Sequence, residues 1–470
     1  MVFSSTVFLF IFLPVTYILY IICRNIKIRN IILILASLCF YAYGEPKAVL
    51  LMILSIIVNY LFGLGVTTEK RKLILIVSII FNIAMLYVFK YLCFSIDLIN
   101  SVLPVTIVNP NIDLPVGISF FTFQAMSYVI DVYKDNSLKE KNILNIFLYI
   151  SLFPQLIAGP IVKFSDLSDQ IKNRTLTLDN TICGIRRFIY GLSKKMIIAN
   201  TMGQIADAAF NNDINLMSSG ALWVGAAAYM LQIFFDFSGY SDMAIGLGKM
   251  FGFEFKENFN YPYAASSMTD FWRKWNISVS TWFKEYVYIP LGGNRKGKLR
   301  TSINKCIVFF LTGLWHGANL TFVVWGLLHG MLLLLESYGA VPFTKKNHTA
   351  AKIISHIYVI FAAMFTFIFF RADNISHAVK YIAHMFTALK GEYLQSSLVF
   401  SYMTPYFALV AVMAFLFSTP VIPNLKNKLT EKGHSNINEY CSCAVSIVLF
   451  GICVMSVFTS AYNPFIYFRF

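Results

Sequence analysis

Two histidines, His316 and His329, lie within one apolar stretch that covers residues 304–338. A helix of that length would reach about 52 Å at about 1.5 Å per residue, whereas the hydrocarbon core of a bilayer is about 30 Å thick. We therefore expect the stretch to break at membrane depth. Because glycine tolerates strained backbone and weakens helices, the predicted break points are Gly313, Gly317 and Asn319.

The chemistry open to these histidines is that of an ionisable group inside a membrane, which indicates function by default. An imidazole titrates near neutral pH and can remove the proton of a hydroxyl group. On an unbroken helix His316 and His329 would lie about 20 Å apart on different faces, so they could not hold one metal ion together. The break could bring them closer. The alternative is that both are hydrogen-bonded packing histidines, although the glycines and Trp315 beside His316 favour function there.

The composition is that of a helical membrane protein. Of 470 residues, 57% are hydrophobic and 13% are charged, and the mean hydropathy is +0.65. The apolar residues form runs of about 17–25 residues between short charged loops, which predicts an all-α polytopic membrane protein. The positive residues behind the net charge of +15 lie in those loops. The positive-inside rule explains this pattern, so we expect a lipid bilayer and no nucleic acid as partner.

Several familiar sites are absent from the sequence. The eight cysteines are scattered without a Cys-x-x-Cys spacing, so we expect no disulfide framework and no metal site. A Walker loop and a Gly-x-Ser-x-Gly nucleophile elbow are also missing, so any reaction must start from an activated substrate. The residues alone leave two classes open. One is an enzyme with a buried histidine as general base, and the other is a transporter with His316, Asp236 and Asp242 as a polar relay.

The elements that position these residues begin with five spans whose orientation follows from charge. Lys and Arg cluster near residues 24–29, 70–72 and 134–141, whereas the loop 97–113 has neither. This alternation predicts an extracytoplasmic N-terminus. We expect the first span to be retained rather than cleaved as a signal peptide. The expected spans are residues 3–22, 30–44, 48–66, 73–95 and 115–133.

Three later segments are less regular. Residues 143–162 contain Pro154, Gly159 and Pro160 and predict either a kinked span or a re-entrant segment. Residues 181–204 carry too many charges for a clean span and predict a helix at the cytoplasmic surface. Residues 218–250 predict a span in which Asp236 and Asp242 either cap the helix or take part in chemistry.

Residues 266–288 predict an amphipathic helix in the plane of the membrane interface. Ser267 and Asp270 match a capping box, and aromatic residues then recur at helical spacing on one face. The basic loop that follows, residues 295–300, indicates the cytoplasmic side and could also receive a phosphate-bearing ligand. The aromatic and basic character of the whole region, residues 266–300, favours an enzyme over a transporter.

The C-terminal third predicts spans near residues 351–371, 397–421 and 439–460. No polar stretch is longer than a loop, so we expect a single integral-membrane domain, residues 1–470. Within it we distinguish N-terminal spans (1–135), a catalytic core (136–345) and C-terminal spans (346–470).

Several longer motifs are informative in combination: Leu114–Gln124, Phe153–Pro160, Asp236–Asp242, Asn258–Tyr263, Asp270–Ser278, Tyr288–Arg295, Gly313–Gly317 and Asn463–Phe470. Together they resemble the membrane-bound O-acyltransferases, in the branch typified by alginate O-acetylation proteins. The resemblance covers nearly the whole chain. It implies a ring of about 11 tilted spans, with re-entrant and interfacial helices, around a central tunnel.

The resemblance also implies roles for residues. His316 matches the essential histidine of the family and His329 a second recurrent one, so both are candidate catalytic residues. Candidate substrate-binding residues are Trp272, Arg273, Trp275, Asn276, Trp315, Asn319, Asp236 and Asp242. No resident cofactor is implied. The implied donor is a cytosolic acyl thioester, most simply acetyl-CoA.

The implied acceptor is a hydroxyl group outside a bacterial cell membrane, on a polysaccharide or on a partner such as an SGNH-type acetyltransferase. As a hypothesis, His316 removes the hydroxyl proton, and Asn319 or backbone amides freed at the break stabilise the oxyanion. An acyl-histidine route stays open. The alternative within the family is transfer of D-alanine from a carrier protein to teichoic acid.

Overall fold

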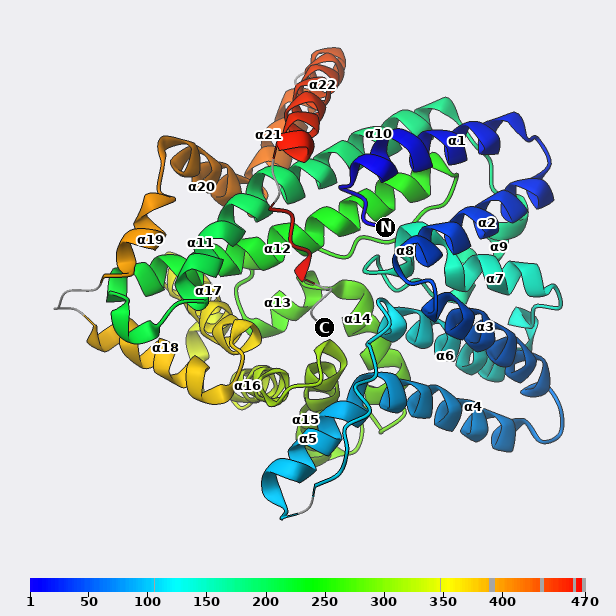
Figure 1. Ribbon diagram of the computed structural model, residues 1–470, viewed down its shortest axis with the longest axis horizontal. Helices are drawn as coiled ribbons and strands as arrows, with labels where there is room; N and C mark the ends of the chain where they lie inside the picture. Colours follow the sequence, from blue (N-terminus) through cyan, green and yellow to red (C-terminus); the bar gives the residue numbers. More distant parts are fainter. Residues whose placement is uncertain (105, 347, 389–393, 432–434, 460–461, 467–470) are drawn as a thin grey trace. The chain divides into compact units, whose positions relative to one another are not determined.

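The computed structural model describes residues 1–104, 106–346, 348–388, 394–431, 435–459 and 462–466 (Figure 1). Within these ranges helices are the only regular secondary structure, which confirms the predicted all-α class. The chain forms two compact units. The N-terminal unit comprises residues 1–188 and 240–256, and the C-terminal unit comprises residues 189–239 and 257–470.

The N-terminal unit is built from the first nine α-helices, the start of α10 and the end of α12. Its core is apolar, and α6 contacts α3, α4 and α7 (Figure 1). The elements are η1 (Phe8–Phe12), α1 (Leu13–Ile22), α2 (Ile26–Gly44), α3 (Ala48–Gly65), α4 (Arg71–Leu86), η2 (Tyr87–Tyr91), α5 (Leu92–Val102), α6 (Ile118–Lys134), η3 (Asn136–Leu138), α7 (Ile143–Ser151), α8 (Phe153–Leu156), α9 (Phe164–Asn173), α10 (Leu178–Ser193) and α12 (Ser219–Met250).

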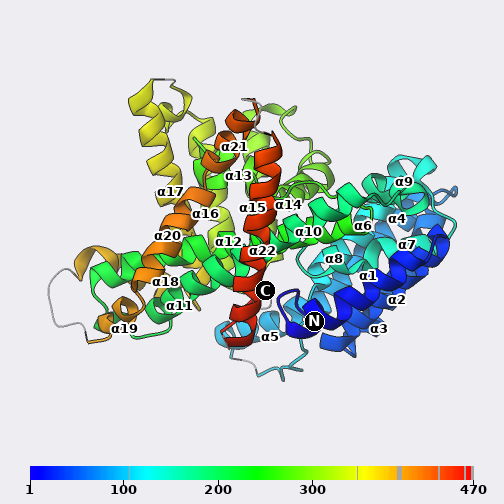
Figure 2. The same cartoon turned by 90° about the horizontal axis from the view of Figure 1, so that it is seen from above.

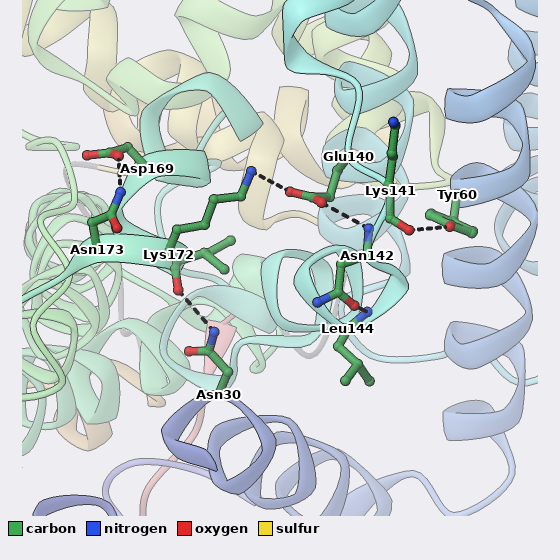
Figure 3. A network of polar contacts seen from close by, with 10 residues as sticks. Asn30, Tyr60, Glu140, Lys141, Asn142, Leu144, Asp169, Lys172 and Asn173 are labelled. Atoms are coloured by element: carbon green, nitrogen blue, oxygen red, sulfur yellow. Dashed lines mark hydrogen bonds and ion pairs between the residues drawn. The ribbon is translucent and has the colours of Figure 1, made fainter. Parts of the chain in front are cut away.

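Polar side chains fasten the loops of this unit to one another (Figure 3). Glu140, ahead of α7, pairs with Lys172 of α9 at 2.8 Å and accepts a hydrogen bond from the backbone N–H of Asn142. Asn30 of α2 donates to the carbonyl of Ile171. These contacts tie α2, α7 and α9 together at their ends.

The C-terminal unit contains the histidine-bearing stretch. In it α16 contacts α13, α15 and α17 (Figure 2). The remaining elements are η4 (Lys194–Ala199), α11 (Asn200–Phe210), η5 (Ile214–Leu216), η6 (Pro262–Ala264), α13 (Met268–Lys274), α14 (Ile277–Phe283), η7 (Lys284–Tyr288), α15 (Gly297–His316), α16 (Leu320–Ser337), η8 (Pro342–Lys345), α17 (Thr349–Arg371), α18 (Ile375–Thr387), α19 (Ser396–Ser401), α20 (Pro405–Phe417), α21 (Val421–Glu431) and α22 (Ser435–Thr459).

Among the described residues, 7 helical segments are long and apolar enough to cross a membrane, which confirms a polytopic protein. Shorter apolar helices cover Phe8–Ile22 and Pro405–Phe417. The seven segments are Ile26–Gly44, Ala48–Gly65, Arg71–Val102, Ser219–Met250, Leu320–Ser337, Thr349–Arg371 and Glu439–Thr459.

Three predicted segments differ from the structure. Residues 143–162 are not one kinked span, because α7 ends at Ser151 and the backbone after the short α8 is non-helical and buried. Residues 181–204 do not lie wholly at a surface, since Lys195 is buried beside Asp236. The span expected at 397–421 is divided into α19 and α20.

Candidate active site

The predicted break in the histidine stretch is present. Helix α15 ends at His316, Gly317 is fully extended, and Asn319 caps the start of α16 by accepting a hydrogen bond from Thr321 N–H at 3.0 Å. The break therefore lies at residues 317–319. Gly313, a third predicted break point, stays inside α15.

Close packing explains why Gly313 is a glycine. A Cβ atom on Gly313 would lie 2.3 Å from the carbonyl oxygen of Phe322, and one on Gly326 would lie 2.2 Å from that of Phe309. Small residues allow membrane helices to approach backbone to backbone. The chain therefore folds back at the break, and α16 runs antiparallel against α15.

This hairpin brings the two histidines to one shared neighbour, Trp325. The imidazole centroids of His316 and His329 each lie 4.9 Å from the ring centroid of Trp325, in edge-on arrangements. Trp315 and Phe370 also contact His316, at 4.9 and 5.2 Å. Both histidines are buried, so the break brings together what sequence spacing alone kept apart.

Trp272 connects the aromatic segment to this centre. Its indole N–H donates a hydrogen bond to His329 Nδ1 at 3.2 Å, and Phe271 stacks on the same imidazole with an interplanar angle of 8°. Trp275 stacks on Phe271 and contacts Phe367. Of the predicted binding residues in this segment, Arg273 alone is exposed, whereas Trp272, Trp275 and Asn276 are buried.

The interfacial helix predicted over residues 266–288 is interrupted. Helix α13 ends at Lys274, and Asn276 takes a left-handed conformation (φ 43°) before α14 begins. Asn276 is buried, and neither end of its amide has a hydrogen-bond partner among the described residues. The capping box is present in part, since Ser267 accepts from the Asp270 N–H.

Sequence reasoning missed the residue that positions α13. Glu336, near the end of α16, is buried and its carboxylate accepts hydrogen bonds from the N–H groups of Met268 and Thr269 at 2.5 and 3.0 Å. A carboxylate at a helix N-terminus satisfies unpaired amides and is favoured by the helix dipole. The only sequence signal was a lone acidic residue at the end of an apolar run.

A cavity of about 150 Å³ lies within the C-terminal unit near His316. Asn319 from the break, Phe370 and Arg371 from the end of α17, and Gln232 from α12 line it, together with residues 464–466. His316 does not line the cavity, but Phe370 contacts the imidazole and the cavity alike. Asn319 uses both ends of its amide, since Nδ2 donates to the carbonyl of Asp373.

The two aspartates of α12 have separate partners. Asp236 pairs with Lys195 at 2.7 Å and accepts from the backbone N–H of Ile466. Asp242, in the N-terminal unit, pairs with Arg187 at 2.6 Å. Both lie inside α12, so neither caps its end.

The pair of Asp236 and Lys195 holds the C-terminal segment, which sequence reasoning connected to the site only through resemblance. Lys195 donates to the carbonyl of Pro464, and Tyr462 donates to Asp207 at 2.6 Å. Residues 467–470 of the terminal motif lie outside the described residues. In the described part of the chain, no three His, Cys, Asp or Glu side chains are arranged to hold a metal ion.

Comparison with known proteins gives consistent matches. The model of the membrane-bound O-acyltransferase family matches residues 38–374. The chain is 36% identical to "Probable alginate O-acetylase AlgI" of Pseudomonas putida over 100% of both chains, and 33% identical to the peptidoglycan O-acetyltransferase of Helicobacter pylori over 100% of this chain and 98% of that protein. It is 29% identical to the teichoic acid D-alanyltransferase of Bacillus subtilis over 47% of this chain and 58% of that protein.

Proposed function

Because the chain belongs to the membrane-bound O-acyltransferase family and is therefore a multi-pass membrane acyltransferase, we propose that it transfers an acetyl group from acetyl-CoA to a hydroxyl group outside the membrane. One observation carries the proposal. A buried histidine ends a helix at a break in a membrane hairpin, and Phe370 connects it to a cavity lined by polar groups.

His316 is the general base of the proposed reaction. It takes the proton of the acceptor hydroxyl while that oxygen attacks the thioester carbonyl, forming a C–O bond. The C–S bond then breaks, and the thiolate of coenzyme A takes this proton from the imidazolium. The ester and the free thiol leave, and His316 is neutral again. Trp315, Trp325 and Phe370 surround the imidazole and would exclude the water that hydrolyses thioesters.

The charge pattern supports a direction for the two substrates. Helix α15 begins in the basic segment 295–300, and α17 begins after Lys345 and Lys346. The positive-inside rule places both starts on the cytoplasmic side, and hence His316 and Arg371 towards the opposite side. The cavity beside Arg371 would then receive the acceptor from outside, and the thioester would arrive from the cytoplasm. The same rule supports an extracytoplasmic N-terminus, and we propose that the membrane is that of a bacterial cell.

The acceptor side of the proposal draws on the relatives. Proteins named for alginate and peptidoglycan O-acetylation align with the whole chain, which supports a cell-surface polysaccharide as the final acceptor. The hydroxyl that first receives the acetyl group belongs either to that polymer or to an SGNH-type partner that passes it on. We also propose that residues 1–470 act as one functional domain.

The candidate binding residues divide by their surroundings. Trp272 and Trp275 belong to the aromatic cluster around His329, and Asn276 is buried directly after Trp275 in the chain. These three residues are proposed to shape the donor site. Asn319 lines the cavity and is proposed to contact the acceptor. Arg273 is exposed and suits the phosphates of coenzyme A.

The test uses the full-length protein in lipid nanodiscs with acetyl-CoA, reading thiol release and acetyl transfer to a soluble polysaccharide acceptor. General-base catalysis contributes about 10²–10⁴-fold, so His316→Ala should lose at least about 100-fold in rate with an unchanged unfolding temperature. His384→Ala is the matched control, because the half-buried His384 lies on another helix, and its ring nitrogen contacts the Lys380 carbonyl one turn away on that helix. Full polymer acetylation by cells that carry His316→Ala would end the base assignment.

The alternative substrate is D-alanine on a carrier protein. The teichoic acid D-alanyltransferase of Bacillus subtilis aligns with only about half of the chain, whereas the acetylation proteins align with all of it. Offering D-alanyl carrier protein and acetyl-CoA to the same preparation separates the two. Thiol release from the carrier alone would favour the alternative.

A further inference from the structure

We propose that His329 is a hydrogen-bond donor in the reaction and not a second base, and that Trp272 is the positioning residue that fixes it in that role. The inference rests on the proposed function, because it assigns a task within the same acyl transfer. Its starting point is the contact between the Trp272 indole and His329 Nδ1.

The contact fixes the tautomer of His329. An indole N–H can only donate a hydrogen bond, so the nitrogen that faces it must present a lone pair. Nδ1 of His329 is therefore unprotonated, and the single proton of the neutral ring sits on Nε2. An imidazolium would carry N–H groups on both nitrogens and would turn one of them against the indole N–H. The arrangement accordingly opposes protonation of His329.

The Nε2–H group is the part of His329 that remains available. The side chain is 0% exposed, and Nε2 has no hydrogen-bond partner among the residues that the structure describes. Leaving a buried donor unsatisfied is costly, so such a group indicates a ligand that satisfies it. A donor without an acceptor suits an oxygen atom that gains negative charge.

The acyl transfer provides such an oxygen. When a hydroxyl attacks a thioester, the carbonyl oxygen becomes an oxyanion that needs fixed N–H donors. His329 and His316 both contact the ring of Trp325, so the proposed donor and base belong to one cluster of side chains, and the proposal places the reacting carbonyl group against that cluster. Asn319, the other candidate, already uses both ends of its amide at the break.

Two further contacts keep the indole in place. Glu336 holds the first turn of α13 through the N–H groups of Met268 and Thr269, one turn before Trp272. The Trp272 ring itself packs edge-on against Trp325, with centroids 5.8 Å apart. Contacts at the start of α13 and at Trp272 itself thus fix the indole nitrogen relative to α16.

The first experiment reads the tautomer directly, by ¹⁵N NMR of histidine-labelled full-length protein in nanodiscs. The ¹⁵N shifts distinguish a nitrogen that carries a proton from one with a lone pair. We expect unprotonated Nδ1 and protonated Nε2 at His329 in the wild type, and a mixture of tautomers in Trp272→Phe. Trp223→Phe is the control, because the Trp223 indole donates to the Met385 carbonyl in another part of the unit. A protonated Nδ1 in the wild type would overturn the proposal.

The second experiment asks whether a donor is what the reaction needs. Loss of one oxyanion donor costs about 10²–10³-fold in kcat, so His329→Leu should lose that much. His329→Gln keeps an N–H near the Nε2 position and should recover at least tenfold of the loss. The ascending limb of the pH profile should be the same in both variants and the wild type, because His316 is the base.

Equal activities of His329→Gln and His329→Leu, or loss of the ascending limb in either variant, would contradict the donor role. If the wild type acetylated nothing from any thioester, the proposed function would fail while the NMR measurement still decided the tautomer. If both His329 variants failed to fold, Trp272→Phe would carry the kinetic test, with a lower kcat and an unchanged pH profile expected.

Discussion

Two helix pairs of this protein bury polar side chains in opposite ways. In the N-terminal unit, Asn59 of α3 and Asn82 of α4 exchange amide hydrogen bonds at 3.2 and 2.8 Å, and each also donates to a carbonyl of its own helix. In the C-terminal unit, α15 and α16 approach through glycines, and His329 keeps a buried nitrogen without a partner in the described part of the chain. The first pair satisfies its own amides, whereas the second leaves a buried nitrogen unsatisfied, which we propose a substrate to fill.

The largest effect on stability is expected at the glycine contact. In Gly326→Ala the new Cβ would lie 2.2 Å from the Phe309 carbonyl oxygen, so α15 and α16 must separate. Overpacking of this kind costs about 1–3 kcal/mol. Thermal unfolding in detergent measures the loss. Gly451→Ala on α22 is the control, because nothing lies within 4 Å of the added carbon. Equal stability of the two variants would show that α15 and α16 are packed less closely than the glycine contact implies.

A smaller effect is expected at the amide pair. Asn82→Leu removes the partner of a fully buried Asn59 and should reduce stability by about 1 kcal/mol. The double variant Asn59→Leu/Asn82→Leu removes both amides. Its loss of stability should be smaller than the sum of the losses in the two single variants. Thiol release per folded molecule should stay unchanged in Asn59→Leu, Asn82→Leu and the double variant. Additive losses would mean that the two amides do not stabilise each other.

The next comparison separates the role of the Asn276 backbone conformation from the role of its side-chain amide. Glycine accepts the left-handed conformation and alanine resists it, so Asn276→Ala should be about 1 kcal/mol less stable than Asn276→Gly. If the buried amide contacts a substrate, Asn276→Gly should fold normally yet raise KM for the thioester. Wild-type kinetics in Asn276→Gly would leave Asn276 with a conformational role alone.

The smallest effect is expected at the ion pair of Glu140 and Lys172, which, like the amide pair, joins two polar side chains to each other. Partial burial raises the pKa of the Glu140 carboxyl, but hydrogen bonds from Lys172, Asn142 and Asn145 and the charge of Lys172 outweigh it, so the pKa lies below its usual value. A lowered pKa means that the ionised pair stabilises the fold above the ordinary Glu pKa of about 4.3, and that this contribution fades as the pH falls through the folded pKa.

Glu140→Gln tests this sign. At pH 7 the variant should be less stable than the wild type by up to about 1 kcal/mol, because Lys172 is half exposed. Unfolding temperatures recorded at decreasing pH should converge below about pH 4.3. A stability difference between wild type and Glu140→Gln that grows as the pH falls would contradict a lowered pKa of Glu140.

The sequence was sufficient for features that depend on length and local chemistry. The break at 317–319 follows from an apolar stretch that is longer than a membrane is thick, together with Gly317 and Asn319. The polytopic class follows from the apolar runs. Both predictions use only neighbours along the chain.

Features that depend on distant partners could not be predicted this way. The aromatic spacing of residues 266–288 continues across Asn276, so periodicity does not reveal that the helix stops there. The contact of Trp272 with His329 joins residues 57 positions apart and needs the folded hairpin. Lys195 looked like a surface charge because its partner, Asp236, lies on another helix.

The carboxylate of Glu336 has a consequence for exchanging parts between relatives. Because it holds the start of α13 from the end of α16, these two helices depend on each other for their placement. A chimaera that takes α16 from a protein without an acidic side chain at this position would release the amides of Met268 and Thr269. The indole that faces His329 would then be displaced, even if the incoming helix carried the same histidine and tryptophan as α16.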